Sequence, residues 1–324
     1  MMKKNLSRRQ FLGSGSLALL GMVGGYGFIA ESGSNRTTKN ISSTLPFRIS
    51  LNTSTIRAYN LTVEQQIDTV AEAGYDGIEL WVSDVNTYLN SGGTTSSLAS
   101  RLKDKNLVLE NMIGFAPWFT EDLGARTRGL EQLEREMKVV SEIGGKYIAA
   151  PVQGVRALDR TMLDDYAARY RTILELSDLT GVVPILELWG HAALSNLADE
   201  AWIVIATGHP KASMLLDFYH LYRGGNSWET LDILNFSKMP VFHINDFPDT
   251  PPREQLRDAD RVFPGDGICP FNILVPRLYN AGFRGAFSIE LFNQSYWDTM
   301  DVKTLLKTGY EKTLNVLTNS IAGL

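Results

Sequence analysis

Short apolar runs with the character of β-strands alternate with helical stretches along most of the chain. The strand-like runs are Phe47–Leu51, Gly77–Val82, Leu107–Met112, Tyr147–Ala150, Val182–Leu188, Met214–Phe218, Val241–Ile244 and Ala286–Leu291. The helical stretches are Val63–Ala73, Ser96–Lys105, Thr127–Ile143, Thr161–Leu179, Asn196–Ala206, Ser227–Asn235, Phe271–Ala281 and Val302–Asn319. This alternation predicts an α/β fold, a (β/α)8 TIM barrel of parallel strands. The alternative is a doubly wound open sheet, but no glycine-rich phosphate loop follows the first strand.

Two local signals support the helical assignments. Apolar residues recur at spacings of three and four in one long stretch, at Leu130, Leu133, Met137, Val140 and Ile143. Several helices are followed by a glycine shortly before the next strand, at Gly74, Gly144, Gly181 and Gly282. Glycine accepts the left-handed backbone that closes a helix. The predicted helices therefore end shortly before the next predicted strand, as the alternation of strands and helices requires.

The first 31 residues have the pattern of an export signal. The stretch from Ser7 to Leu12 (SRRQFL) follows two lysines and precedes a glycine-rich apolar run from Leu17 to Ile29, which is short for a membrane span. Paired arginines followed by Phe-Leu are typical of a twin-arginine signal. We therefore expect residues 1–31 to be the signal, 32–44 a linker and 45–324 the catalytic barrel. The expected location is the periplasm, with membrane contact only through an uncleaved signal.

The charge of the chain indicates which partners are expected, and its cysteine content indicates whether a disulfide can form. The net charge is -5, and no cluster of lysine and arginine occurs beyond the signal, so nucleic acid is not an expected partner. Cys269 is the single cysteine, which excludes an intrachain disulfide despite the expected oxidising compartment. The sequence leaves the oligomeric state open, including a homo-oligomer.

A carboxylate or an imidazole stands at the end of each of the last four strand-like runs. These residues are Glu187, Asp217, His243 and Glu290. Consecutive parallel strands of a barrel end on one rim, so their last side chains can converge. Three carboxylates and one imidazole form a hard, oxygen-rich set suited to Mn²⁺, Mg²⁺ or Co²⁺. Any one of them could be an ordinary polar strand end, but four in register predict a divalent metal site.

The segments around these residues resemble the xylose isomerase-like TIM barrel superfamily, in particular its sugar epimerases and keto-sugar isomerases of the tagatose 3-epimerase and inosose isomerase types. The matching segments are Leu186-Glu187, Asp217–His220 (DFYH), His243–Asp246 (HIND), Arg261–Gly267 (RVFPGDG), Ser288–Phe292 (SIELF) and Tyr75–Leu80 (YDGIEL). The resemblance spans the whole barrel, and its motifs are densest after Val182. It is specific for the superfamily and only weakly specific for a substrate.

The resemblance implies an isomerase or epimerase that removes a proton from the carbon beside a carbonyl. A dication stabilises the resulting enediolate as a Lewis acid, and two carboxylates on opposite faces of the substrate take and return the proton. By this resemblance Glu187 and Glu290 are both metal ligands and the catalytic acid/base pair. Asp217 and His243 are then ligands only.

Four further residues are candidates for contact with the substrate. In the family, a histidine three residues after the aspartate ligand binds substrate, which implies this role for His220. An arginine before the Pro-Gly turn contacts a substrate oxygen through its forked donors, which implies this role for Arg261. We expect His191 to line the pocket and Glu79 to face it or brace it. For each, an ordinary loop or surface role is the alternative.

Other residues near the predicted rim carry weaker signals. Asp246, three residues after His243, is expected to orient a neighbour of the metal site or to cap a loop. The long proline-rich loop 245–261 is expected to be a lid or a specificity loop. Aromatic residues after strand ends can stack on sugar rings or simply pack in loops. They are Trp81, Phe115, Trp118, Trp189, Tyr296 and Trp297.

The expected substrate is an unphosphorylated keto-sugar or keto-glycoside, because the chain has no evident phosphate cradle and carries the export pattern. The alternative reaction is a lyase, in which the same metal and base eliminate the aglycone of a 3-keto-glycoside. An endonuclease of similar fold would need a multi-zinc site rich in histidine, whereas this chain has four histidines. A non-catalytic sugar-binding protein would be expected to have two lobes with a hinge.

Overall fold

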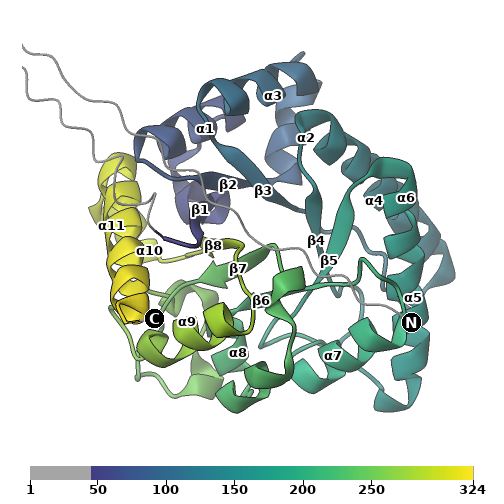
Figure 1. Ribbon diagram of the computed structural model, residues 1–324. Helices are drawn as coiled ribbons and strands as arrows, with labels where there is room; N and C mark the ends of the chain where they lie inside the picture. The colour runs from purple at the N-terminus through teal and green to yellow at the C-terminus, as the bar shows by residue number, and fades with distance from the viewer. Residues whose placement is uncertain (1–44, 324) are drawn as a thin grey trace, which may run out of the picture. The chain divides into compact units, whose positions relative to one another are not determined.

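A computed structural model of the protein describes residues 45–323, and in them eight parallel strands form a closed barrel in chain order, with the first strand paired to the last. The strands are β1 (Arg48–Asn52), β2 (Gly77–Trp81), β3 (Val108–Ile113), β4 (Tyr147–Pro151), β5 (Val183–Glu187), β6 (Met214–Asp217), β7 (Val241–Ile244) and β8 (Ala286–Ile289). They lie at the centre of Figure 1, surrounded by the helices. The predicted (β/α)8 barrel is confirmed, and the open sheet is excluded.

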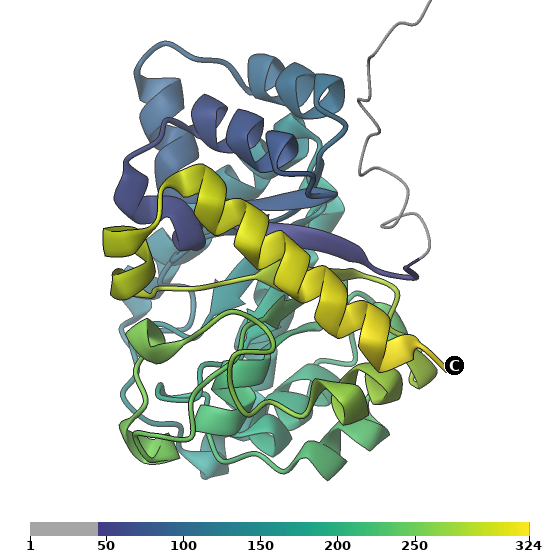
Figure 2. The same cartoon turned by 90° about the vertical axis from the view of Figure 1, so that its left-hand side faces the viewer.

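Helices cover the outside of the barrel. They are α1 (Val63–Glu72), α2 (Val82–Asn90), α3 (Thr95–Asp104), α4 (Leu123–Ile143), α5 (Leu163–Glu175), α6 (Ser177–Thr180), α7 (Leu197–Ala206), α8 (Phe218–Arg223), α9 (Phe271–Asn280), α10 (Gln294–Thr299) and α11 (Val302–Ile321). Short 3₁₀ segments are η3 (Thr53–Tyr59), η4 (Arg160–Met162), η5 (Trp228–Ile233), η6 (Phe236–Lys238), η7 (Arg253–Gln255) and η8 (Asp258–Asp260). The C-terminal helix α11 runs along the outside of β1 (Figure 2).

The connection between β6 and β7 differs from the sequence prediction. A helix was expected over 227–235, where the structure has the 3₁₀ segment η5, and no side chain caps the start of η5. The helix α8 instead begins directly after β6, because the Asp217 side chain accepts a hydrogen bond from the backbone N–H of His220 at 2.8 Å. A carboxylate at that place satisfies a free amide of the first helical turn. A predicted metal ligand thus also starts a helix.

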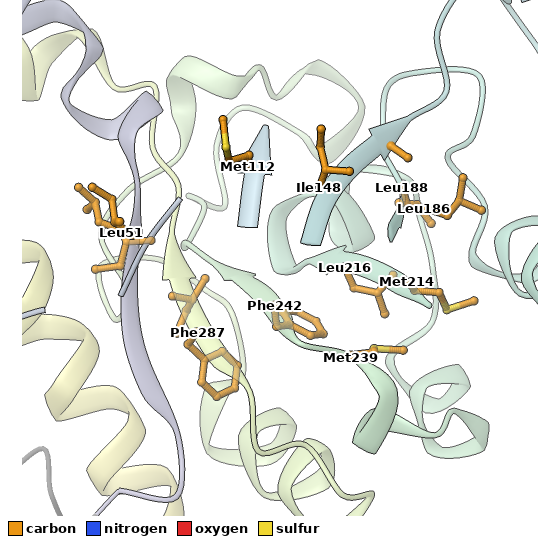
Figure 3. Close-up of a cluster of buried hydrophobic side chains, with 14 of the residues drawn as sticks. Leu51, Met112, Ile148, Leu186, Leu188, Met214, Leu216, Met239, Phe242 and Phe287 are labelled. Carbon is orange, nitrogen blue, oxygen red and sulfur yellow. The ribbon is translucent and has the colours of Figure 1, made fainter. Parts of the chain in front are cut away.

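The main core lies between the barrel and the helices. Outward-facing strand residues such as Leu51, Phe242 and Phe287 are fully buried there. Figure 3 shows them on neighbouring strands, and the rings of Phe242 and Phe287 have centroids 6.1 Å apart. Burying each such side chain stabilises the fold by roughly 1.5–3 kcal/mol. This packing holds the strand ends, and hence the predicted ligands, at fixed positions on the rim.

The interior of the barrel has an apolar and a polar part. A separate apolar cluster contains one residue from each strand from β3 to β7: Ile113, Ala149, Ile185, Leu215 and Val241. On the other side, Ser50, Ser288 and His243 are buried register partners on β1, β8 and β7. The buried Glu79 of β2 completes this polar part. The His243 ring therefore has polar support from inside the barrel.

The expected signal (1–31) and linker (32–44) lie outside the described residues. Among the helices of residues 45–323, none combines the length and the apolar character that crossing a membrane requires.

Candidate active site

The four predicted ligands lie on one rim of the barrel. Glu187 and Asp217 are the last residues of β5 and β6, His243 is in β7, and Glu290 directly follows β8. Asp217 and His243 are register partners. All four side chains are buried, with at most 6% of each residue exposed. The sequence and the topology thus bring all four to one place.

The imidazole of His243 is at the centre of this group. Its Nδ1 lies 3.3 Å from Oε2 of Glu290, 3.8 Å from Oδ2 of Asp217 and 4.0 Å from Oε1 of Glu187. The ligand atoms of Asp217, His243 and Glu290 all lie within 4.8 Å of one another, and Glu187 stands beside this trio. The arrangement is compact enough for one cation to be shared by the group.

Two features of these side chains fit a divalent cation. Nδ1 of His243 and Oε2 of Glu187 are buried and have no hydrogen-bond partner. The other ring nitrogen of His243, Nε2, lies 3.3 Å from Oε2 of Glu79. A carboxylate at that distance accepts the Nε2 proton and turns Nδ1 toward the three carboxylates, where a bound cation would take its lone pair. Glu79 therefore makes the bracing contact, one of its two predicted alternatives.

The two candidate catalytic glutamates have opposite electrostatic environments. Burial raises the pKa of Glu187 to about 8. Burial also acts on Glu290, but the nearby His243 and Arg261 outweigh it and lower the pKa of Glu290 to about 2. Carboxyl groups whose pKa values are pushed apart are typical of acid/base pairs. A bound dication would favour the ionised form of both.

Arg261 is buried at the edge of the carboxylate group. Its Nη1 lies 2.6 Å from Oε2 of Glu290 and 3.4 Å from Oδ2 of Asp217. Its Nη2 lies 3.0 Å from Nε2 of His220 and 2.6 Å from Oδ1 of Asp258. The planar fork therefore connects two predicted ligands to a predicted substrate residue.

His220 and His191 lie together beside this fork. Their ring centroids are 5.3 Å apart, and Nε2 of His191 lies 3.8 Å from Oδ2 of Asp258. His220 is buried, and its Nδ1 has no hydrogen-bond partner, whereas the His191 side chain is 37% exposed. Both histidines thus border the site.

Asp246 holds the loop that carries Arg261. Its carboxylate accepts hydrogen bonds from four backbone N–H groups, those of Phe247, Gly265, Gly267 and Cys269. Its backbone forms an antiparallel bridge with Val262, next to Arg261. Of the two expected roles of Asp246, the structure shows the loop cap.

Sequence reasoning missed two asparagines that contact the predicted ligands. The Asn52 amide donates to Oε1 of Glu290 at 2.9 Å, and the Asn245 amide donates to Oδ2 of Asp217 at 2.7 Å. Asn52 ends β1 and Asn245 directly follows β7. A search for every polar residue at a strand end, instead of acids and histidines alone, would have found both.

Comparison with known proteins identifies the family. A family model described as a xylose isomerase-like TIM barrel matches residues 67–319. The chain belongs to this family. Similarity to an inosose isomerase of Bacillus velezensis amounts to 27% identity over 263 residues, which is 78% of this chain and 91% of that protein.

Two further proteins are similar to this chain, one in sequence and one in structure. A 3-dehydro-D-guloside 4-epimerase of Escherichia coli is 23% identical over 235 residues, or 67% of this chain and 82% of the epimerase. The crystal structure of the IOLI protein with a zinc atom aligns with a TM-score of 0.78 and 20% identity, over 85% of this chain and all of that one. This structural likeness shows the same fold, and the predicted membership of the xylose isomerase-like barrels is confirmed.

Proposed function

We propose that the protein is a divalent-metal-dependent isomerase or epimerase of an unphosphorylated keto-sugar. The observation that carries the proposal is the convergence of Glu187, Asp217 and Glu290 on Nδ1 of His243. The names of the relatives, an isomerase and an epimerase of keto compounds, support it.

In the proposed mechanism, the two glutamates move the proton. Glu290 is kept ionised by Arg261 and His243 and serves as the base that takes the proton from the carbon beside the substrate carbonyl. Glu187 gives a proton to the substrate or takes one from it, on the face of the substrate opposite Glu290. The positive charge of Arg261 stabilises negative charge that develops on the substrate oxygen. A bound divalent cation would polarise the substrate carbonyl as a Lewis acid.

The metal proposed for this site is Mn²⁺, Mg²⁺ or Co²⁺, since three of the four donors are carboxylates. Zn²⁺ belongs in any test, because the IOLI protein of the same fold holds a zinc atom.

The proposal of an unphosphorylated substrate is supported by the cationic groups of the site. Within residues 45–323, Arg261 is the only buried lysine or arginine, and its Nη1 and Nη2 already contact Glu290, Asp217, His220 and Asp258. A phosphate dianion would require further donors.

We also propose that the protein works in the periplasm, on the pattern of residues 1–31. Cell fractionation of the wild type and of a double variant, Arg8→Lys with Arg9→Lys, tests this. We expect the wild type in the periplasmic fraction and the variant in the cytoplasm; a wild type that stays in the cytoplasm overturns it.

The function is tested by proton NMR in D₂O. Protein loaded in turn with Mn²⁺, Mg²⁺, Co²⁺ or Zn²⁺ is incubated with free ketoses, inososes and 3-keto-glycosides, and chelated protein is the control. Deuterium at the carbon beside the carbonyl, together with a new isomer, is the expected result. Absence of exchange across the panel, in protein that has been shown to bind metal, overturns the sugar assignment.

A lyase acting on a 3-keto-glycoside is the second candidate. One relative is named a 3-dehydroshikimate dehydratase, and a dehydratase carries out an elimination, which favours this reaction. The base takes the proton at carbon 2, a double bond forms between carbons 1 and 2, and the bond from carbon 1 to the aglycone oxygen breaks. The aglycone leaves as an alcohol after protonation. Free aglycone in the same NMR experiment identifies the lyase.

A further inference from the structure

Three aromatic rings form an arc along the rim of the barrel. Trp81 ends β2, and Phe115 and Trp189 each lie two residues beyond a strand, β3 and β5. The Phe115 ring is 5.2 Å from the Trp81 ring and 6.1 Å from the Trp189 ring, measured between centroids. Phe115 is 38% exposed, and both tryptophans are half-buried. The arc thus presents aromatic surface at the end of the barrel that carries the site.

Hydrogen bonds connect one end of this arc to Glu290. The Trp81 indole N–H donates to Oδ1 of Asn52 at 3.0 Å, and the amide of Asn52 donates to Glu290. Because the indole N–H of Trp81 is used in this way, the orientation of this ring is fixed. The guanidinium of Arg57 lies over one face of the ring, 5.1 Å from its centroid. At the other end, Trp189 lies close to Glu187.

The other candidate aromatics have different contacts. Trp118 is 1% exposed and packs against Phe119, while the indole N–H of Trp297 donates to the backbone of Thr55 at 2.8 Å. Tyr296 stacks on Phe263, with ring centroids 4.3 Å apart. The grouping of Trp81, Phe115 and Trp189 is therefore not a general property of aromatics in these loops.

The wall next to the arc is polar. Trp189 is stacked beside His191 and His220, with centroid distances of 6.4 and 6.3 Å, and Arg261 lies beyond His220. A ligand in this site would meet hydrogen-bond donors at one end and aromatic faces at the other. The C–H faces of sugar rings and aromatic rings both suit such a surface.

We infer that the arc binds a second ring joined to the reacting sugar, so that the substrate is a keto-glycoside. A single pyranose covers one aromatic ring, whereas the arc has three rings in succession. The ring that reacts lies against the glutamates, and the attached ring, an aryl group or another sugar, lies on Phe115. The inference rests on the proposed keto-sugar chemistry and adds the substrate class.

The test compares substrates that share the reacting ring. Exchange of the α-proton is measured by NMR for methyl 3-keto-β-glucoside, phenyl 3-keto-β-glucoside and 3-keto-cellobiose. The variants are Phe115→Ala, Phe115→Leu and the control Leu123→Ala, which removes a side chain that is 70% exposed at the start of α4. We expect the wild type to have a higher kcat/KM for a two-ring substrate than for the methyl glycoside, by about three- to tenfold. The larger gain shows whether an aryl group or a sugar is preferred.

In Phe115→Ala this preference should disappear, in Phe115→Leu it should fall in part, and in Leu123→Ala it should persist. A wild type without the preference, or a Phe115→Ala variant that keeps it, overturns the inference. Failure of the keto-sugar chemistry is recognised separately, as absence of exchange for all three substrates. In that case, binding of unreactive phenyl β-glucoside is measured by quenching of tryptophan fluorescence. Saturable quenching that is lost in Phe115→Ala supports the arc as a ring-binding surface. Absence of saturable quenching in the wild type overturns the inference.

Discussion

Nη1 of Arg261 lies 2.6 Å from Oε2 of Glu290, and both side chains are buried. The same Oε2 lies 3.3 Å from Nδ1 of His243. One carboxylate oxygen therefore faces both a guanidinium and the central imidazole, which is the reason for the low pKa of Glu290. Removing one partner of a buried charge pair leaves the other uncompensated.

Replacing Arg261 should change the pH dependence of activity. Without the guanidinium, burial is opposed only by His243 and by the bound cation, so we expect the pKa of Glu290 to rise by about 1–3 units in Arg261→Met. The base is then protonated at a higher pH, and the acid limb of kcat/KM against pH moves upward. Arg261→Lys keeps the charge and should show a smaller shift. An unchanged acid limb in Arg261→Met would show that Arg261 does not control the ionisation of Glu290.

Glu79 should control metal affinity without touching the metal. Its carboxylate accepts the Nε2 proton of His243, so Glu79→Ala frees the ring to turn and to change tautomer. We expect metal affinity to fall by about 10- to 100-fold, as measured by calorimetric titration. Glu110→Gln is the matched control, because Glu110 is a buried carboxylate that pairs with Arg48. Equal affinity in Glu79→Ala and wild type would contradict the bracing role.

Glu290→Gln should separate substrate binding from proton transfer. The amide keeps the shape of the side chain but cannot act as the base, so exchange of the α-proton should fall by about 10²- to 10⁴-fold. Binding of a ketose should be largely retained at saturating metal, as judged by ligand-observed NMR. Normal exchange in this variant would remove Glu290 from the catalytic role.

Metal should stabilise the fold, because it binds the native arrangement of the carboxylates and not the unfolded chain. At a metal concentration of about 100 times Kd the expected gain is about 2.7 kcal/mol. Thermal unfolding with and without chelator measures this as a rise in Tm. The gain should disappear in Asp217→Asn with His243→Ala; a gain that survives in this double variant would place the metal elsewhere.

Glu200 should lower stability as the pH rises. It is fully buried on α7, neither carboxylate oxygen has a hydrogen-bond partner, and burial raises its pKa well above the ordinary value. The unfolded chain loses this proton above about pH 4.5, whereas the folded protein keeps it, so the free energy of unfolding falls by about 1.4 kcal/mol per pH unit in that window.

Glu200→Gln cannot titrate, so its free energy of unfolding should rise relative to wild type between pH 5 and 8. Urea unfolding at several pH values measures the difference, and the exposed Glu142→Gln controls for loss of a charge. A difference between Glu200→Gln and wild type that does not vary with pH would show that Glu200 is ionised in the folded protein.

Much of the site was predictable because its ligands obey a local rule. Glu187, Asp217, His243 and Glu290 each end a short apolar run, and parallel strands put all such ends on one rim. The contacts around the ligands obey no such rule. Asn52 and Glu290 are 238 residues apart in the chain, and Arg261 comes from a long loop without a strand pattern.

The aromatic residues near the rim also could not be told apart from the sequence alone. Six were candidates, and the sequence treats them alike. Only the tertiary positions of the strand ends and the contacts of the rings separate Trp81, Phe115 and Trp189, which form the arc, from Trp118, which packs in the core.

The sequence by itself determined the barrel, the family and the four residues that converge on its rim, because periodicity and strand-end chemistry are local properties of the chain. The tertiary structure alone decided which side chains surround those four. Closure of β1 against β8 brings Asn52 to Glu290, β2 brings Glu79 to His243, and the loop held by Asp246 carries Arg261 into the carboxylates. These contacts join distant segments, and packing, not local pattern, sets their geometry.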